Sequence, residues 1–302
     1  GPEGEKGEKG DKGDKGDPGD GGVTDHAALT GLDEDDHPQY LLAGARATPN
    51  GVAFTGTLAT GSLAATGAGT RFLWHPARAA IRAGTVSAFG ATYWDASNLG
   101  ANSAAFGENT RASGAASFAA GLATTASGAE SVALGNNGTA SADRAFAFNG
   151  TASGVGAVAI GSGAQATSDD ALAMGPSSIA GGLASIVLGP SIANGSFGVA
   201  IGLQNSASGN FSVAIGKNAR TANRQGSIVL GDGCAGFSSD SVYPSANNQF
   251  IARGCGGIKF YTNQALTAGV EVAPGGGSWN TISDRNRKEN FGEIDGDDLL
   301  RR

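Results

Sequence analysis

A short phrase returns throughout the middle of the chain, with small residues alternating with aliphatic ones and a glycine closing the run. The clearest copies are Ser131–Gly135, Ala157–Gly161, Ala171–Gly175, Ser185–Gly189, Ser212–Gly216 and Ser227–Gly231. With the degenerate copies, the closing residues lie at 90, 107, 121, 135, 149, 161, 175, 189, 202, 216 and 231, mostly 14 positions apart. A period kept over so many copies indicates a solenoid, whose repeats pack only on their neighbours.

Each repeat predicts one coil made of short strands and tight turns. Alternation of period two is typical of a strand, and turns rich in Gly and Asn, such as Asn136–Gly138, close the corners. No repeat has room for a crossover helix, so residues 85–232 are predicted to form a parallel β-solenoid of eleven coils. We expect Val132, Leu134 and their equivalents to fill the inside. Such a thin coil buries little area, so a solenoid of one chain would be only marginally stable. Its small-residue face allows another chain to approach closely, which predicts a core shared between chains, most simply in a homotrimer.

The phrase and its spacing resemble the head repeats of YadA-like trimeric adhesins. The resemblance covers about half of the chain and implies a left-handed parallel β-roll formed by three chains. The copies that end at 107, 121 and 149 carry Phe where the family has smaller aliphatic residues. We therefore expect those coils to be wider or irregular.

Residues 1–22 begin with unbroken triplets that have Gly in the first place. Only Gly fits at the axis of three packed polyproline-type chains, so this segment predicts a collagen-like triple helix. A charged linker would not need Gly at every third place. The triple helix requires three chains, as does the predicted shared core of the solenoid.

Residues 23–45 contain His26 and then Asp35-Asp-His-Pro-Gln-Tyr40. This pattern resembles an element of bacteriophage tail-fibre proteins, which implies a joint between three chains. His26 and His37, with the acidic residues nearby, are a less favoured candidate metal site, because imidazole and carboxylate groups from three chains would meet at the axis. We expect neither a metal nor a cofactor.

Residues 46–84 are predicted to be a β-rich connector and a cap for the first coil, because solenoids need their open ends covered. Trp74, Arg78 and Arg82 offer an alternative, a surface on which a sugar stacks. This segment and the following Tyr93–Gly100 resemble the part that precedes YadA-like repeats in phage and prophage proteins.

After residue 232 the period stops. Residues 233–282 carry three short strand patterns, at Gln249–Gly254, Gly257–Thr262 and Gly269–Ala273, and predict a small trimeric β-cap. Residues 283–302 resemble the opening of the intramolecular chaperone of endosialidases and other phage fibres, the peptidase S74 family. By that resemblance Ser283 attacks the peptide bond before it and Lys288 is its partner, in a self-cleavage of a single turnover. Only the opening of such a chaperone is present, so we expect it to be truncated and self-cleavage to be doubtful here.

Composition excludes some functions. A net charge of −7 without a basic patch argues against nucleic acid as a partner. The longest apolar runs are too short for a transmembrane helix, so we expect no membrane insertion. Cys234 and Cys255 fit no metal motif; we expect free thiols, although a bond within or between chains is open. The chain begins within its triplet pattern and carries no signal peptide, which indicates an internal part of a longer protein.

Taken together, the sequence predicts the distal part of a trimeric bacteriophage tail fibre on the virion. Its expected partners are a glycan or protein receptor on the host surface and other tail or baseplate proteins. It is not expected to be an enzyme beyond self-cleavage. The alternatives are a bacterial trimeric surface adhesin and a polysaccharide depolymerase tailspike, which would need paired carboxylates across a groove.

Overall fold

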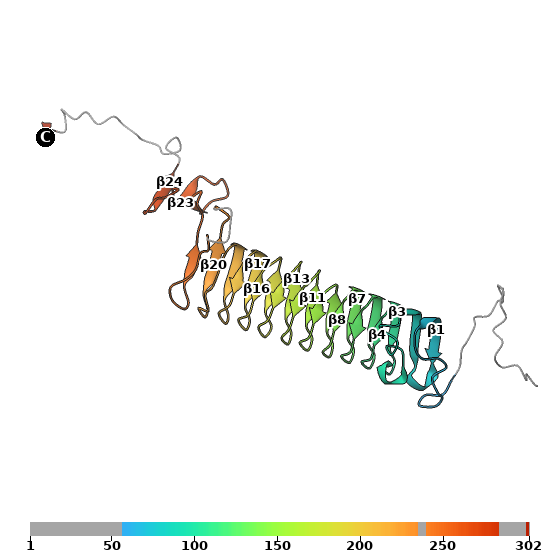
Figure 1. Ribbon diagram of the computed structural model, residues 1–302. Helices are drawn as coiled ribbons and strands as arrows, with labels where there is room; N and C mark the ends of the chain where they lie inside the picture. The colour runs from blue at the N-terminus through green and yellow to red at the C-terminus, as the bar shows by residue number, and fades with distance from the viewer. Residues whose placement is uncertain (1–55, 235–239, 284–299, 302) are drawn as a thin grey trace, which may run out of the picture. The chain divides into compact units, whose positions relative to one another are not determined.

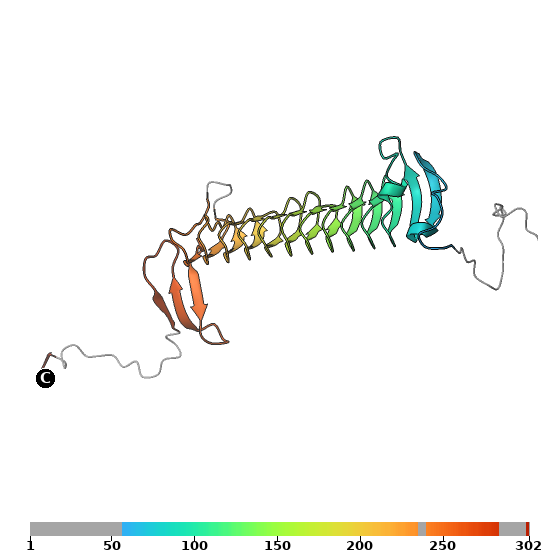
Figure 2. The same cartoon turned by 90° about the horizontal axis from the view of Figure 1, so that it is seen from below.

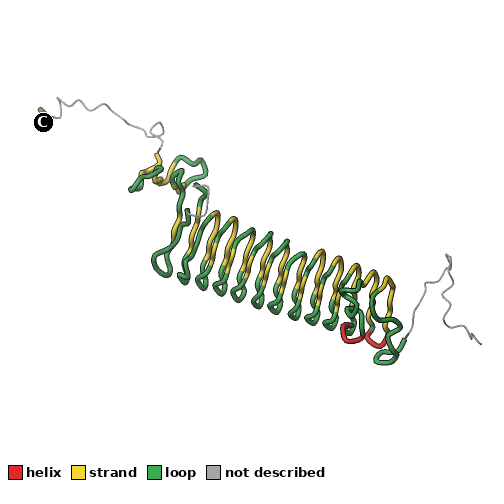
Figure 3. Tube along the Cα trace, viewed as in Figure 1, coloured by secondary structure: helices red, strands yellow, loops and turns green. Residues whose placement is uncertain are grey.

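The computed structural model describes residues 56–234, 240–283, 300 and 301, and these form an almost entirely β structure. Two single 3₁₀ turns, η2 (Pro76–Arg78) and η3 (Ala96–Asn98), are drawn red in Figure 3, beside the first coils. The predictions for residues 1–22, for residues 23–45 and for most of residues 283–302 lie outside the described part.

Residues 80–252 form a parallel β-solenoid, as the period predicted (Figure 1). It has about nine turns, fewer than the eleven coils that we expected. Every coil gives one strand to a long sheet, and the coils of β3 to β17 also give one to a narrow sheet, with successive coils stacked in register (Figure 2). The long sheet contains β2 (Ala80–Val86), β3 (Ala104–Glu108), β5 (Phe118–Leu122), β7 (Val132–Asn136), β9 (Phe146–Phe148), β11 (Val158–Ile160), β13 (Leu172–Met174), β15 (Ile186–Leu188), β17 (Val199–Leu203), β19 (Val213–Lys217), β20 (Ile228–Gly231) and β21 (Phe250–Ala252). The narrow sheet contains β4 (Arg111–Ala112), β6 (Thr125–Ala126), β8 (Thr139–Ala140), β10 (Thr151–Ala152), β12 (Gln165–Ala166), β14 (Ile179–Ala180), β16 (Ile192–Ala193) and β18 (Ser206–Ala207).

The inside of the solenoid is filled by alanine, which contradicts our expectation for the aliphatic residues. The second residue of each long-sheet strand from β3 to β20 is fully buried, as Ala133 is, and so is the Ala of each narrow-sheet strand, as Ala140 is. The coil is so flat that two alanine methyl groups fill the space between its sheets. The larger Val132 and Leu134 therefore lie on the outside, half-buried.

The outer side of the long sheet is consequently apolar along its whole repeat region. We call this surface the apolar face; from β5 to β20 it comprises Phe118, Ala120, Val132, Leu134, Phe146, Phe148, Val158, Ile160, Leu172, Met174, Ile186, Leu188, Val199, Ile201, Val213, Ile215, Ile228 and Leu230. The expectation that Phe widens its coils is wrong, because Phe118 and Phe148 point out of the coil. The coil that ends at Asn149 is irregular, as the alternative predicted, but in the length of its corner. The outer side of the narrow sheet is more polar and carries, for example, Thr125, Thr139 and Gln165.

The small residues at the two ends of the phrase have separate tasks. The opening Ser lies buried at a corner and its hydroxyl donates to the backbone oxygen three residues earlier, as from Ser131 to Gly128 at 2.7 Å. The closing Gly has positive φ, which is +122° at Gly121. A Cβ added at Gly121 would lie 2.0 Å from the oxygen of Gly135 in the next coil, so only Gly fits there.

The first coil is closed by a hairpin of β1 (Gly69–His75) and β2, which pair antiparallel. Trp94 is fully buried and its indole N–H donates to the oxygen of Thr110 at 2.8 Å. The phrase Ala88–Gly90, predicted to be the first coil, lies instead in a turn with Phe89 85% exposed, and β2 takes the place of that strand.

Arg82 lies inside this first coil, where later coils have alanine. Its register partner is Ala105, and its side chain is fully buried. The guanidinium donates to the oxygens of Ser103 at 3.1 Å and Ala112 at 2.7 Å. Burial lowers the pKa of Arg82 to about 10, so the group stays charged at neutral pH. Arg82 thus fills the end of the solenoid and gives a second donor to carbonyl groups that already accept the backbone N–H groups of Ile81 and Gly100.

We expect Arg82→Met to destabilise the first coils by about 3 kcal/mol, because the buried hydrogen bonds from the charged guanidinium to Ser103 and Ala112 are lost. Hydrogen exchange of residues 80–112 would measure this loss as faster exchange. Arg78→Met, at an exposed position of the same cap, is the control and should change stability by less than about 0.5 kcal/mol. Equal exchange in both variants would contradict the assigned role.

The chain beyond the repeats departs from the prediction in one strand. The expected cap strand near Phe250 is β21, which pairs parallel with β20 and so extends the solenoid sheet. The next two expected strands are β22 (Ile258–Tyr261) and β23 (Ala268–Val272), and β24 (Asn280–Ser283) joins them in an antiparallel sheet. Within residues 250–282 no side chain is buried, although Phe260 and Trp279 contact each other with ring centroids 5.6 Å apart. This small sheet has no core of its own.

Candidate functional site

The apolar face is the largest candidate interaction surface. Its side chains come from successive coils in register, as Val158 pairs with Leu172 and Ile160 with Met174. Several of these side chains are more than a third exposed, including Met174 at 38% and Leu188 at 36%. Soluble monomers rarely expose a continuous apolar surface of this extent, so the face is suited to bind another protein surface.

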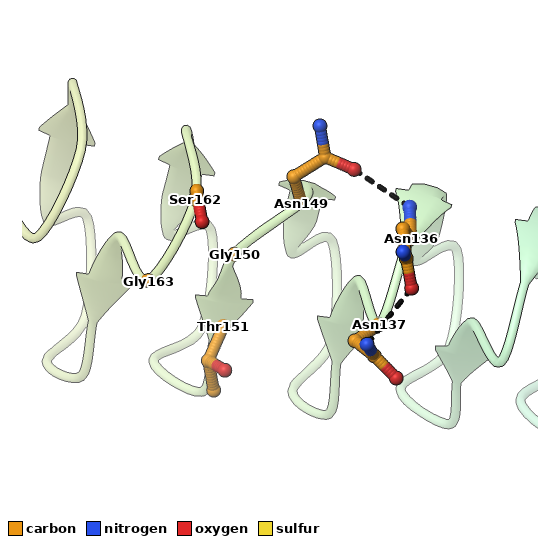
Figure 4. A pocket seen from close by; sticks show the side chains of 7 residues that line it. All are labelled: Asn136, Asn137, Asn149, Gly150, Thr151, Ser162 and Gly163. Atoms are coloured by element: carbon orange, nitrogen blue, oxygen red, sulfur yellow. Dashed lines mark hydrogen bonds between the residues drawn. The ribbon is translucent and has the colours of Figure 1, made fainter.

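A pocket interrupts one corner between the long and the narrow sheet. In most coils the narrow strand begins four positions after the closing residue, as at Thr139 after Gly135, but in the coil of β9 it begins only two positions after it, at Thr151 after Asn149. The sequence shows this as a step of 12 instead of 14. The lost residues leave a hollow, here called the notch, lined by Asn136, Asn137, Asn149, Gly150, Thr151, Ser162 and Gly163 (Figure 4).

Asn149 makes the short corner possible. It stands where other coils have the closing Gly and adopts a φ of 55°, which Asn tolerates better than most residues. Its side-chain Oδ1 accepts from the backbone N–H of Asn136 at 2.6 Å (Figure 4). The side chain therefore provides an acceptor to the preceding coil.

A second pocket lies at the other shortened corner. In the coil of β15 the narrow strand begins at Ile192, three positions after Gly189 and one fewer than usual. The distance in sequence from Gly189 to the next closing residue, Gly202, is accordingly 13 instead of 14. Ser177, Pro190, Ser191, Ile192, Gln204, Asn205, Ser206 and Arg220 line this pocket. Both described pockets therefore coincide with the places where the period shortens.

A cluster of polar groups and a disulfide lie where β20 and β21 end. Leu230 pairs with Ala252, so the residues just beyond both strands come together. Cys234 and Cys255 form a disulfide with Cα atoms 6.0 Å apart, which corrects our expectation of free thiols. As a disulfide, the two sulfurs do not act as thiolate ligands for a metal.

Asp232 accepts hydrogen bonds from both strands' ends in the same cluster. Its carboxylate accepts from the N–H of Cys255 at 2.5 Å and from the Arg253 guanidinium at 2.7 Å. The Cys255 N–H, followed by Arg253, lowers the pKa of Asp232 against the opposing effect of burial. Arg253 also pairs with Asp240 at 2.5 Å. These contacts and the disulfide secure the end of the solenoid.

The structure describes only some of the site residues that were predicted from the sequence. Ser283 is the last residue of β24, where it pairs with Ala268, while Lys288 lies outside the described residues, so the self-cleavage pair stays a prediction. His26 and His37 also lie outside. Of the possible sugar-stacking group, Arg82 is buried inside the first coil, so the structure favours the cap over that surface.

Comparison with protein families gives one match. The YadA head domain repeat (two copies) matches residues 126–148, 152–178, 166–191 and 193–219, all within the solenoid. No curated protein sequence matches the chain. The solenoid is therefore similar to a YadA-type head, as the phrase predicted. In the part of the chain that the structure describes, there is no helix long and apolar enough to cross a membrane.

Proposed function

We propose that this chain is a segment of a homotrimeric surface fibre that attaches to a host cell. The apolar face carries the proposal. None of the side chains that define it is charged, although Lys217 ends β19 beside it. Three chains that pack these faces around one axis would remove their apolar side chains from water. The shared core is thus built from the aliphatic residues, whereas the sequence suggested the small ones.

The small sheet of β22, β23 and β24 gives independent support. It has exposed apolar side chains, such as Phe260 at 52% and Trp279 at 56%, and no buried one. Three strands need a hydrophobic face packed against something to be stable. Equivalent sheets from two further chains would supply that partner.

We propose more specifically that the fibre belongs to a phage tail. The support is sequence resemblance alone: the triplets of residues 1–22, the element Asp35–Tyr40 and the opening of a chaperone after Ile282. Its partners would be a glycan or protein on the host surface and neighbouring tail proteins, and its place the virion. A bacterial trimeric surface adhesin is the second candidate, because the YadA head match suits both.

A polysaccharide depolymerase has less support. Hydrolysis of a glycosidic bond uses two carboxyl groups across a cleft. Neither described pocket is lined by Asp or Glu. We therefore propose no enzymatic activity besides the single self-cleavage before Ser283.

Light scattering of the full chain tests the trimer. We expect a solution mass of three chains, and a monomer at micromolar concentration would contradict the proposed fibre. Intact-mass spectrometry of the same sample tests self-cleavage. A chain that ends at Ile282 would show that Ser283 acts, whereas a full-length chain would show that it does not.

A further inference from the structure

We propose that the notch binds an uncharged saccharide. The inference starts from its place in the solenoid: two residues are missing from one corner, and the neighbouring coils on both sides keep theirs. Asn136 and Asn137 come from the coil before, Thr151 from the shortened coil, and Ser162 from the coil after (Figure 4). The hollow is therefore a built feature that three coils share.

The notch presents hydrogen-bonding groups that the chain itself does not use. Asn136 Oδ1 accepts from Asn137 Nδ2 at 2.8 Å, which fixes both amides. Asn149 Nδ2, Asn137 Oδ1 and the hydroxyls of Thr151 and Ser162 make no hydrogen bond within the described residues. Hydrogen-bond donors and acceptors therefore lie close together in the notch. A sugar hydroxyl suits such a lining, because it can both donate and accept a hydrogen bond.

The lining also decides against other ligands. No Lys, Arg, Asp or Glu lines the notch, so an ionised ligand would lose hydration without a counter-charge. A peptide would need a free strand edge or pockets for apolar side chains. The backbone N–H groups of Asn149 and Thr151 already donate to Leu134 and Ala164, and the lining is Asn, Thr, Ser and Gly.

The second pocket extends the argument to a chain of sugars. It lies at the same corner, three coils further along, since β11 and β13 stand between β9 and β15. At about 4.8 Å per coil the two pockets are roughly 14 Å apart along the solenoid. An oligosaccharide lying along the corner could occupy both, with the second pocket adding the amide of Gln204. Arg220, which also lines that pocket, already donates from its Nε to the hydroxyl of Ser241 at 2.7 Å.

This inference rests on the adhesive part of the proposed function, for which it names a class of receptor. It does not require the trimer. The two ideas can therefore fail separately, provided that the solution mass and saccharide binding are measured on the same protein.

The test titrates the full chain by calorimetry with short uncharged oligosaccharides of glucose, galactose, mannose and N-acetylglucosamine. Sialylated and uronic-acid oligosaccharides form the charged set. A corner-restored variant, with Asn149–Gly150 replaced by the Gly-Asn-Asn-Gly of the preceding corner, fills the notch with a sequence that this solenoid already folds. Thr151→Val removes one hydroxyl without changing shape. Thr125→Val, at the same strand position in a coil with a full corner, is the matched control.

We expect at least one uncharged oligosaccharide to bind, with no binding to the corner-restored variant. Thr151→Val should weaken affinity about fivefold, as the loss of one hydrogen bond predicts, and Thr125→Val should leave it unchanged. The inference is overturned if only charged oligosaccharides or none bind, or if the corner-restored variant binds as well as the parent. A trimer that binds no saccharide refutes this inference alone, and a monomer that binds one refutes the proposed fibre alone.

Discussion

Ile160→Glu should abolish assembly of the trimer. Ile160 lies in β11 near the middle of the apolar face, with Phe148 and Met174 beside it in the neighbouring coils. Its side chain is half-buried in the single chain, so Glu can stay hydrated there and the coil itself tolerates it. In the trimer the carboxylate would be buried without a partner, at a cost of several kcal/mol for each of three chains. Light scattering should show loss of the three-chain species.

Gln165→Glu is the matched control. It adds the same charge five residues later in the same coil, but on the exposed outer side of the narrow sheet. We expect this variant to keep the parent mass. A trimer that survives Ile160→Glu would show that the apolar face is not the interface, and an equal loss in both variants would show that net charge alone prevents assembly.

The sequence predicted the coils well because a period and a turn are local features. The parallel stacking and the positive φ of Asn137 and Asn149 followed directly from the phrase and its corners. Which face pointed inward did not follow, since alternation separates two faces without saying which is enclosed. The sequence did contain a signal. The third residue of the phrase is Ala or Val, as at Ala133 and Val187, whereas the residues on either side of it vary in size up to Phe. The flat inside of the coil does not tolerate such variation in size, so the flanking residues of the phrase point out of the coil.

The disulfide and the notch depended on information at longer range. Cys234 and Cys255 meet because β21 joins the solenoid sheet, and the sequence had placed that strand in a separate cap. The notch was visible in the sequence only as the step of 12 that ends at Gly161. The step alone did not show which corner was short. The structure resolves this, because Ala152 and Val158 keep the usual spacing and the whole loss falls between Asn149 and Thr151.

Gly121→Ala should destabilise the solenoid by about 4 kcal/mol or more, the largest effect we expect from a single methyl group. The new Cβ would lie 2.0 Å from the backbone oxygen of Gly135, and the backbone φ of +122° is unfavourable for any L side chain. Neither atom can move without breaking hydrogen bonds, because β5 and β7 pair along their whole length. Each coil packs only on its neighbours, so loss of the packing between the coils of β5 and β7 should separate the solenoid into two parts that unfold independently. Urea unfolding followed by circular dichroism would show a lower midpoint.

Gly163→Ala is the control that measures the cost of positive φ alone, without a clash between the new methyl group and the next coil. Gly163 also has positive φ, +71°, but the nearest atom to an added Cβ is 3.8 Å away. This variant should lose only about 1 kcal/mol, the usual cost of placing an L residue in the left-handed region. If both variants lost the same stability, close stacking of the coils would not be the reason that the phrase ends in glycine. If Gly121→Ala alone is severe, close contact between successive backbones is the reason that the phrase ends in glycine.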